Sequence, residues 1–183
     1  MAQDNIELYP DFLMKEHLNI FDEECMKSYY IWDSTEEIPF QGFIHRAFPI
    51  GRASNLGIIM IATYAVQKIV EIKNLPEASL RRAFINILPR GLQGGWHNDT
   101  NEEDSYTLII NTSKVDGGTE IGKQFFKNNF NEAILFNSNL THRGIGPTHS
   151  TYRSNLAIVI KTLKGTSLWL TKLTVGDGLL SNR

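Results

Sequence analysis

The sequence has little of what would place it in several common classes of protein. Its 183 residues include one cysteine, Cys25, so no disulfide can form within the chain. It also lacks a long hydrophobic run, because polar residues such as Gln67 and Lys68 interrupt the most apolar stretch, residues 56–70. These absences predict a soluble protein that folds without disulfides in a reducing compartment, the cytoplasm.

An excess of basic residues is also missing. The chain has 18 Lys and Arg residues against 20 Asp and Glu residues, a net charge of -2. Proteins that bind nucleic acid need cationic side chains to neutralise phosphates, so this balance makes nucleic acid an unlikely main partner. Residues 1–10 alternate polar and apolar positions, which does not fit a signal peptide, and no membrane partner is expected. The length suits a single domain, residues 1–183.

The amino-terminal part of the chain has the apolar spacing of helices. Residues 10–30 predict one or two short helices, and residues 33–49, with two prolines, predict irregular chain or short strands. Ser54 is positioned as an N-cap before a helix that continues to Asn74. Residues 1–80 should therefore form a helical support layer.

From Arg82 onward, short runs rich in Ile, Val, Leu, Phe and Thr alternate with Gly, Asn and Asp. This texture predicts strands over residues 83–88, 106–111, 118–121, 133–137, 154–163 and 167–175. The fold class is then mainly β with α (α+β), in which the amino-terminal helices back a closed or two-layered antiparallel sheet spanning residues 81–175.

Three residues form a candidate metal site. His97 and Asp99 are two positions apart, so an extended strand or its frayed end would turn both side chains to the same side. His142 follows a second apolar strand and precedes a sequence that resembles a turn. Two imidazoles and one carboxylate can bind one face of an iron(II) ion and leave the opposite face open. His97, Asp99 and His142 are therefore the predicted metal ligands and catalytic residues.

Arg153 begins a strand whose two faces are both largely apolar. A guanidinium in such a strand loses hydration unless an anion meets it. An Asp or Glu of the protein could supply that anion, and so could a bound dicarboxylate.

These residues together resemble the iron(II)/2-oxoglutarate-dependent oxygenases, in particular the prolyl 4-hydroxylase-like branch with its small bacterial and phage members. The likeness covers about residues 82–161 and includes more than the His-x-Asp, distal His and basic residue. A strand ending in glycine, Phe84–Gly91, precedes the first histidine; a Gly-Gly turn leads into a short strand at Asp116–Ile121; and an apolar strand, Glu132–Ser138, precedes His142.

The resemblance implies a double-stranded β-helix (jelly-roll, cupin-like) core with specific residue roles. His97, Asp99 and His142 would bind Fe(II), and Arg153 would pair with the distal carboxylate of 2-oxoglutarate. Asn155 is a further candidate co-substrate contact. Related enzymes often have a tyrosine where this chain has Leu88, and Asn86 is a possible substitute for it. A second such contact would come from Thr107, Ile109 or Asn111. Trp96 and Arg143 are candidate substrate contacts, although aromatic residues beside a sheet are more often core and a carboxylate partner for Arg143 fits at least as well.

The implied activity is that of a dioxygenase using Fe(II), 2-oxoglutarate and O2. Decarboxylation of 2-oxoglutarate to succinate would be coupled to hydroxylation of an unactivated C–H bond. A peptide, protein or free amino acid is the expected substrate, with proline as the leading candidate. Related halogenases replace the metal carboxylate with a small residue, so Asp99 favours hydroxylation.

Two alternatives remain. The first is an AlkB-like oxidative demethylase of nucleic acid, suggested by Asn86 eleven residues before His97 and by Arg153-Ser154-Asn155, but opposed by Val159 where that branch has a second arginine. The second is a non-catalytic cupin-like binding module. His149 competes with His142 as a ligand, but its short spacing to Arg153 leaves no room for a turn.

Overall fold

The structure is a computed structural model that describes residues 6–28, 30–33, 42–48, 55–75, 77–102 and 104–162. These residues form two helices and ten strands: β1 (Glu7–Tyr9), α1 (Lys15–Lys27), β2 (Ile31–Asp33), β3 (Gly42–Phe48), α2 (Leu56–Lys73), β4 (Ala78–Pro89), β5 (Ser105–Asn111), β6 (Gly118–Ile121), β7 (Gln124–Lys127), β8 (Ala133–Asn137), β9 (His142–Ile145) and β10 (Tyr152–Thr162).

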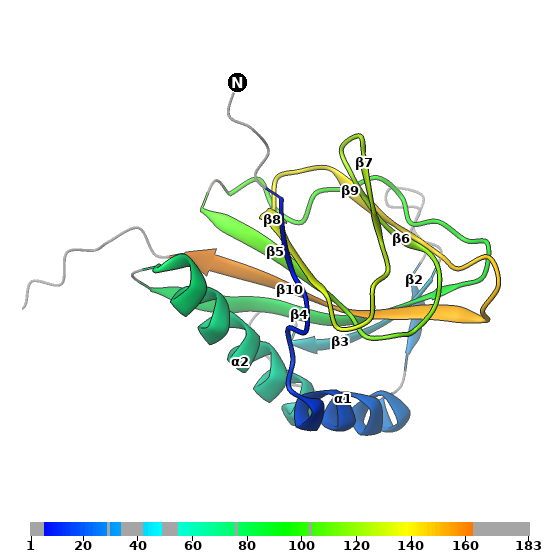
Figure 1. Ribbon diagram of the computed structural model, residues 1–183, viewed down its shortest axis with the longest axis horizontal. Coiled ribbons are helices and arrows are strands. Elements are labelled where there is room, and N and C mark those ends of the chain that lie inside the picture. The colour runs from blue at the N-terminus through cyan, green and yellow to red at the C-terminus, as the bar shows by residue number, and fades with distance from the viewer. Residues whose placement is uncertain are drawn as a thin grey trace, which may run out of the picture.

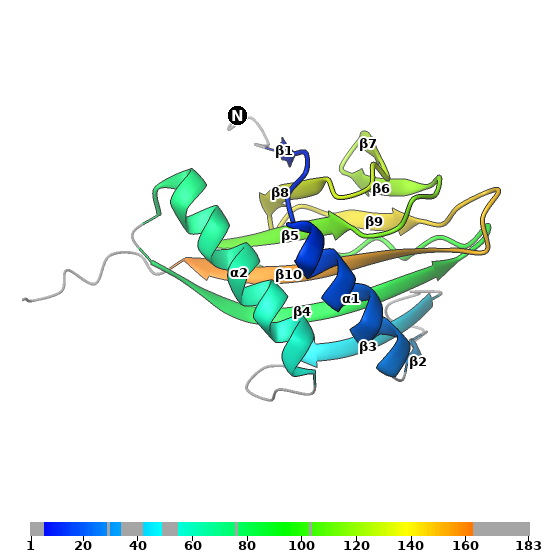
Figure 2. The ribbon, with the colours of Figure 1, turned by 60° about the horizontal axis from the view of Figure 1, so that its bottom comes forward.

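The strands form two antiparallel sheets that face each other. The larger sheet has seven strands in the order β1-β8-β5-β10-β4-β3-β2, and the smaller has three in the order β7-β6-β9. The two helices cover one face of the larger sheet, and the smaller sheet lies over its opposite face (Figure 1, Figure 2). This arrangement is the predicted two-layered sheet backed by amino-terminal helices.

Helix α2 shows why these residues form this element. Its buried side chains recur at helical spacing and pack on β3 and β4: Ile58, Ile61, Ala62, Ala65, Val66 and Ile69. The N-cap is Asn55, whose side chain accepts a hydrogen bond of 3.0 Å from the Ile58 N–H. The predicted cap, Ser54, lies outside the described residues. The helix ends at Asn74, which takes the left-handed conformation that terminates many helices.

Helix α1 packs against α2, and the described residues contain no helix that is long and apolar enough to cross a membrane. The single helix Lys15–Lys27 accounts for the predicted helical region 10–30. Strand β3 supplies a short strand, one of two expectations for residues 33–49, and β2 ends where that region begins.

The predicted strands are present with small shifts in their ends, except that residues 167–175 lie outside the described part of the chain. Three short strands, β1, β7 and β9, were not predicted. The expected turn after His142 is wrong: residues 142–145 form β9, which pairs with β6 and places Ile121 opposite His142.

The larger sheet has two unlike faces. Side chains facing the helices form the main apolar core, which includes Ile85, Leu108, Leu156 and Ile158. Between the sheets lies a smaller apolar cluster of Ile109, Ile121, Ile134 and Phe136, beside polar side chains of the same strands. Because strand residues alternate between faces, one strand supplies the core with every second residue and the space between the sheets with the others.

Candidate metal centre

His97, Asp99 and His142 come together between the two sheets. One potential ligand atom from each lies within 4.8 Å of the other two. His97 and His142 exchange backbone hydrogen bonds of 3.0 and 2.8 Å, and the Asp99 N–H donates to the Ser138 carbonyl at 3.0 Å. His97 thus pairs with β9 outside any named strand, which agrees with the predicted frayed strand end.

Both imidazoles are oriented for coordination through Nε2. The Nδ1 atom of His97 lies 2.9 Å from the Gly95 carbonyl, and that of His142 lies 3.0 Å from the Leu140 carbonyl. Because a carbonyl only accepts, each Nδ1 carries the proton and each Nε2 keeps its lone pair. The two rings lie 4.4 Å apart between centroids, so both lone pairs belong to one small site.

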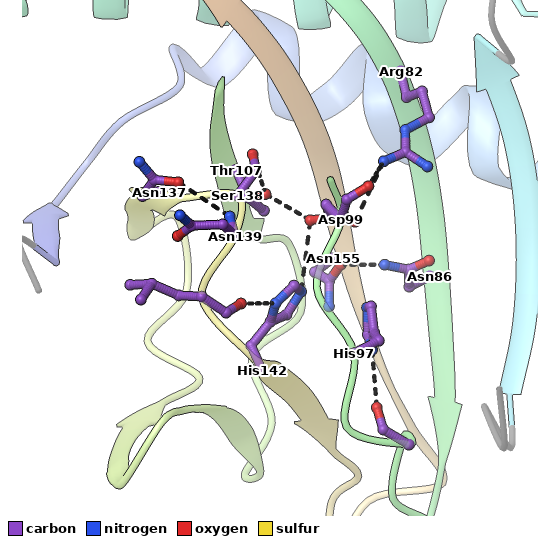
Figure 3. A network of polar contacts seen from close by, with 12 residues as sticks. Arg82, Asn86, His97, Asp99, Thr107, Asn137, Ser138, Asn139, His142 and Asn155 are labelled. Atoms are coloured by element: carbon purple, nitrogen blue, oxygen red, sulfur yellow. Dashed lines mark hydrogen bonds and ion pairs between the residues drawn. The ribbon is translucent and has the colours of Figure 1, made fainter. Parts of the chain in front are cut away.

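The carboxylate of Asp99 is held from two sides (Figure 3). Its Oδ2 accepts a 2.6 Å hydrogen bond from Thr107 Oγ1 and lies 3.6 Å from His142 Nε2. Ser138 Oγ lies 2.9 Å from the same threonine hydroxyl. On the other side, Arg82 Nη2 lies 3.9 Å from Oδ1 and donates to the Asp99 carbonyl. Oδ2 therefore faces His142.

Burial favours the neutral, metal-binding form of His142. The residue is 5% exposed, and the ring of Phe136 packs edge-on against it at 4.9 Å between centroids. Desolvation is the largest influence and lowers the pKa of His142, while the nearby carboxylate of Asp99 raises it. A neutral imidazole needs no deprotonation before it binds a cation.

Arg153 lies on the inner face of β10 and is 1% exposed. Its hydrogen-bond acceptors among the described residues are all uncharged: Asn128 Oδ1 at 2.7 Å, Asn111 Oδ1 at 2.9 Å, Thr119 Oγ1 at 3.0 Å and the Gly118 carbonyl. Burial lowers the pKa of Arg153 to about 10, so the guanidinium stays charged at neutral pH. No protein carboxylate supplies the expected anion within this set of partners.

Two hydrogen-bond donors have no acceptor among the described residues: one N–H of the Arg153 guanidinium and the side-chain amide of Asn111. Four of the five N–H bonds of an arginine are accounted for, which leaves one on Nη1. The Nδ2 amide of Asn111, a residue with no exposed surface, has no hydrogen-bond partner among the described residues. A buried amide without a partner is costly, and a carboxylate placed here would accept from both groups.

The remaining predicted co-substrate residues lie along the same sheet face. Asn86 and Asn155 are directly opposite each other on β4 and β10, and Asn86 Nδ2 donates to Asn155 Oδ1 at 3.1 Å. The register of β5 puts Thr107, Ile109 and Asn111 on this face, where Thr107 contacts Asp99, Ile109 joins the apolar cluster and Asn111 contacts Arg153. Their binding of a co-substrate stays a prediction.

Trp96 and Arg143 lie on the side of the paired His97 and His142 backbones that faces away from the ligand cluster. Each is the immediate neighbour of a ligand histidine in an extended pair, so alternation turns it away from the ligand side. The Arg143 guanidinium stacks 4.7 Å from the Trp96 ring and pairs with Glu120 at 2.5 Å. This placement favours the carboxylate-partner interpretation of Arg143, and Trp96 is 46% exposed instead of lying in the core.

Sequence reasoning missed several residues of this region. Arg82, Ser138, Thr119 and Asn128 hold the ligand carboxylate or the buried guanidinium, but none has a distinctive spacing to the residues it contacts. The Gly117-Gly118 turn was anticipated: Gly117 has a φ of +98°, and a Cβ at Gly118 would lie 2.2 Å from the Phe126 carbonyl oxygen.

No family model matches the sequence, and no curated protein matches it. Solved structures do resemble it. A 2OG-Fe(II) oxygenase family oxidoreductase from Burkholderia pseudomallei superimposes with a TM-score of 0.71 at 14% identity, covering 87% of this chain and 86% of that one. The chain has the fold of the 2OG-Fe(II) oxygenases. The predicted jelly-roll fold class is therefore confirmed.

Two further structures show how varied proteins of this fold are. The viral collagen prolyl hydroxylase of Paramecium bursaria chlorella virus-1, solved as a 2OG complex, has a TM-score of 0.61 at 14% identity and covers 86% of this chain and 96% of its own. The α-ketoglutarate-dependent carbocyclase SnoK of nogalamycin biosynthesis has a TM-score of 0.71 at 11% identity, covering 87% and 80%. At these identities the likeness establishes the fold.

Proposed function

We propose that this chain is a non-haem Fe(II)/2-oxoglutarate-dependent dioxygenase that hydroxylates an unactivated C–H bond of an amino acid, either free or within a peptide. Proline is the leading candidate. The observation that carries the proposal is a buried guanidinium with only uncharged partners among the described residues, in the same space between the sheets as the His-Asp-His cluster. A metal ion would bind the His-Asp-His cluster, and a dicarboxylate would give Arg153 its anion.

The residues present fit the metal. His97 Nε2, Asp99 Oδ2 and His142 Nε2 would be its ligands, since both imidazole Nδ1 atoms are engaged with carbonyls and Oδ2 faces His142. Two histidines and one carboxylate are the ligand set of non-haem iron oxygenases and leave coordination positions open. Thr107 would orient the carboxylate by its hydrogen bond to Oδ2.

The residues present also fit 2-oxoglutarate. The smaller sheet connects the metal ligands to Arg153. Its strand β9 begins at His142, and β6, which pairs with β9, supplies the Gly118 and Thr119 acceptors of Arg153. The distal carboxylate would accept from the free Nη1 N–H of Arg153 and from Asn111 Nδ2. Asn86 and Asn155, between these groups and the metal ligands on the same face, are candidates for further polar contacts.

Bound together with O2, iron and 2-oxoglutarate would supply the oxidation of a C–H bond to an alcohol while 2-oxoglutarate is converted to succinate and CO2. The protein would contribute fixed ligand geometry, a carboxylate clamp and walls that exclude water, such as Phe136 and Ile109. Support for an amino-acid substrate comes from the fold neighbours named as prolyl hydroxylases, including one from Pseudomonas putida.

The proposal is tested by anaerobic titration of the metal-free protein with Fe(II) and 2-oxoglutarate. Wild-type protein should develop a weak visible charge-transfer band that requires both ligands. His97→Ala and Asp99→Ala should abolish it. His149→Ala is the matched control, because this exposed loop histidine lies outside the metal cluster and should leave the band unchanged.

A folded wild-type protein that gives no band would overturn the assignment as a 2-oxoglutarate oxygenase. Succinate release in the presence of proline-containing peptides, free amino acids and methylated oligonucleotides then ranks the substrate classes. A response to methylated oligonucleotides alone would replace the hydroxylase proposal with oxidative demethylation of nucleic acid.

A further inference from the structure

The inner face of the larger sheet is cationic although the chain as a whole has a net charge of -2. Strand alternation assigns the charged side chains of β3, β4, β5, β8 and β10 to one face or the other. Those on the inner face are all basic: Arg46, Arg82, Arg153 and Lys161. Asp99 enters this space from a loop, and Lys161 is paired with Glu102 at 2.7 Å.

Of these four inner-face residues, Arg82 is the one that contacts a predicted metal ligand among the described residues, Asp99. It follows a β-bulge in β4: Val159 of β10 lies opposite Arg82 and Ile160 opposite Leu80, so Arg81 is the extra residue. Bulges often re-aim a side chain beside a functional site. Here the guanidinium lies over Phe84, at 5.7 Å from the ring centre. Figure 3 shows it directed toward Asp99.

Among the described residues, Arg82 has no carboxylate left to pair with once the site is loaded. Its contact with the Asp99 carboxylate is long, 3.9 Å, and that carboxylate would be committed to the metal through Oδ2. Its short hydrogen bond goes to the Asp99 backbone carbonyl, which is uncharged. The side chain is 28% exposed, so it is accessible to a ligand and only partly screened by water.

We propose that Arg82 binds a carboxylate of the substrate, so that the substrate is a free amino acid or a carboxyl-terminal residue and not an internal residue of a peptide. This inference rests on the proposed function. A carboxylate paired with Arg82 would place the carbon atoms next to it beside Asp99, at the ligand cluster. Phe84, beneath the guanidinium, would contribute an apolar surface for the rest of a small substrate.

The test uses the full chain loaded with Mn(II) and 2-oxoglutarate without oxygen. Mn(II) is paramagnetic and broadens the NMR signals of molecules bound close to it. Three mixtures are compared: free L-amino acids, their N-acetyl derivatives as mimics of a carboxyl terminus, and the same amino acids as α-amides. The wild-type protein should broaden signals of specific acids and leave the matching amides sharp.

Three variants test whether Arg82 is the residue that binds the carboxylate. For the acid that binds best, Arg82→Gln should weaken binding by roughly tenfold to a hundredfold, as expected for the loss of a charge-assisted hydrogen bond. Arg82→Lys, which keeps the charge, should lose less. Arg81→Gln is the matched control, since this neighbouring arginine lies 3.9 Å from Glu102 at the surface and should bind the acid as the wild type does.

Several results would overturn the inference: equal broadening of acids and amides, no broadening of either set, or unchanged acid binding in Arg82→Gln. Loss of Mn(II) itself in Arg82→Gln would also overturn it, because the guanidinium would then serve to position Asp99. Failure of the proposed function is seen separately, as absence of the Fe(II) and 2-oxoglutarate band in the wild type.

Discussion

The two faces of the larger sheet are built by the same strands and differ in almost every physical property. Toward the helices, Ile85, Leu108 and Ile158 have no exposed surface and pack in one apolar core. Toward the smaller sheet, their strand neighbours include Asn86 and Thr107, which make specific polar contacts. The comparison teaches that stability and chemistry are separated by side-chain direction and not by region of sequence.

Leu108→Ala should have the largest effect and should act on the fold alone. The side chain is fully buried between the sheet and the helices, so its truncation should lower the free energy of unfolding by about 2–5 kcal/mol. Urea denaturation measures this loss. The Mn(II) affinity of the folded protein should stay within twofold of wild type; a large loss of affinity would show that the two faces are coupled.

Asn111→Asp should place a negative charge directly beside Arg153. The new carboxylate would pair with Arg153 at the position where Asn111 Oδ1 now accepts. Binding of 2-oxoglutarate should fall by about tenfold to a hundredfold, because the protein supplies its own anion, while the apo protein should gain about 1 kcal/mol of stability.

Calorimetry of 2-oxoglutarate binding to the Mn(II) form measures the first effect of Asn111→Asp, and urea denaturation measures the second. Asn111→Ala removes the amide without adding a charge. It should weaken 2-oxoglutarate binding without stabilising the fold, so it distinguishes loss of the amide from the effect of the new carboxylate. Full 2-oxoglutarate affinity in the Asp variant would contradict the role given to Arg153.

Thr107→Val should lower metal affinity by about tenfold, because the hydroxyl that orients Asp99 Oδ2 is removed while the side-chain volume is kept. Mn(II) titration followed by electron paramagnetic resonance measures the change. Thr112→Val is the control: it deletes a comparable hydroxyl contact, at 3.0 Å to Ser154 Oγ, away from the ligand cluster. Equal losses in both variants would mean that the effect is not specific to Asp99.

The smallest expected effect is on pH dependence. Burial keeps the pKa of His142 below the ordinary value of 6.5, so the unfolded chain takes up a proton that the folded chain resists. The stability of the apo protein should therefore be unaffected by this residue above pH 6.5 and should fall as the pH drops below it. Urea denaturation from pH 5 to 8 should show a shallower fall in His142→Gln; identical slopes would contradict this account.

Periodicity predicted much of this fold because α2 and the central strands have regular, local patterns. It failed at β9, where Arg143-Gly144-Ile145-Gly146-Pro147 has the composition of a turn and becomes a strand only because β6 offers partners across the second sheet. The predicted division into support layer and core within one domain stays a prediction.

At the site, the spacing of His97 and Asp99 and the apolar context of Arg153 were enough to nominate the residues that the structure brings together. The register of β5 was not predictable, so Thr107 and Asn111 could not be assigned to opposite ends of the site. Arg82 could not be found at all, because its direction depends on a bulge that is set by pairing with β10.

The central claim is tested most directly by a crystal structure of the protein with Mn(II) and 2-oxoglutarate. The metal should be bound by His97 Nε2, Asp99 Oδ2 and His142 Nε2, and the distal carboxylate of 2-oxoglutarate should contact Arg153 Nη1 and Asn111 Nδ2. A metal bound elsewhere, or a 2-oxoglutarate molecule that leaves Arg153 with uncharged partners only, would contradict the account.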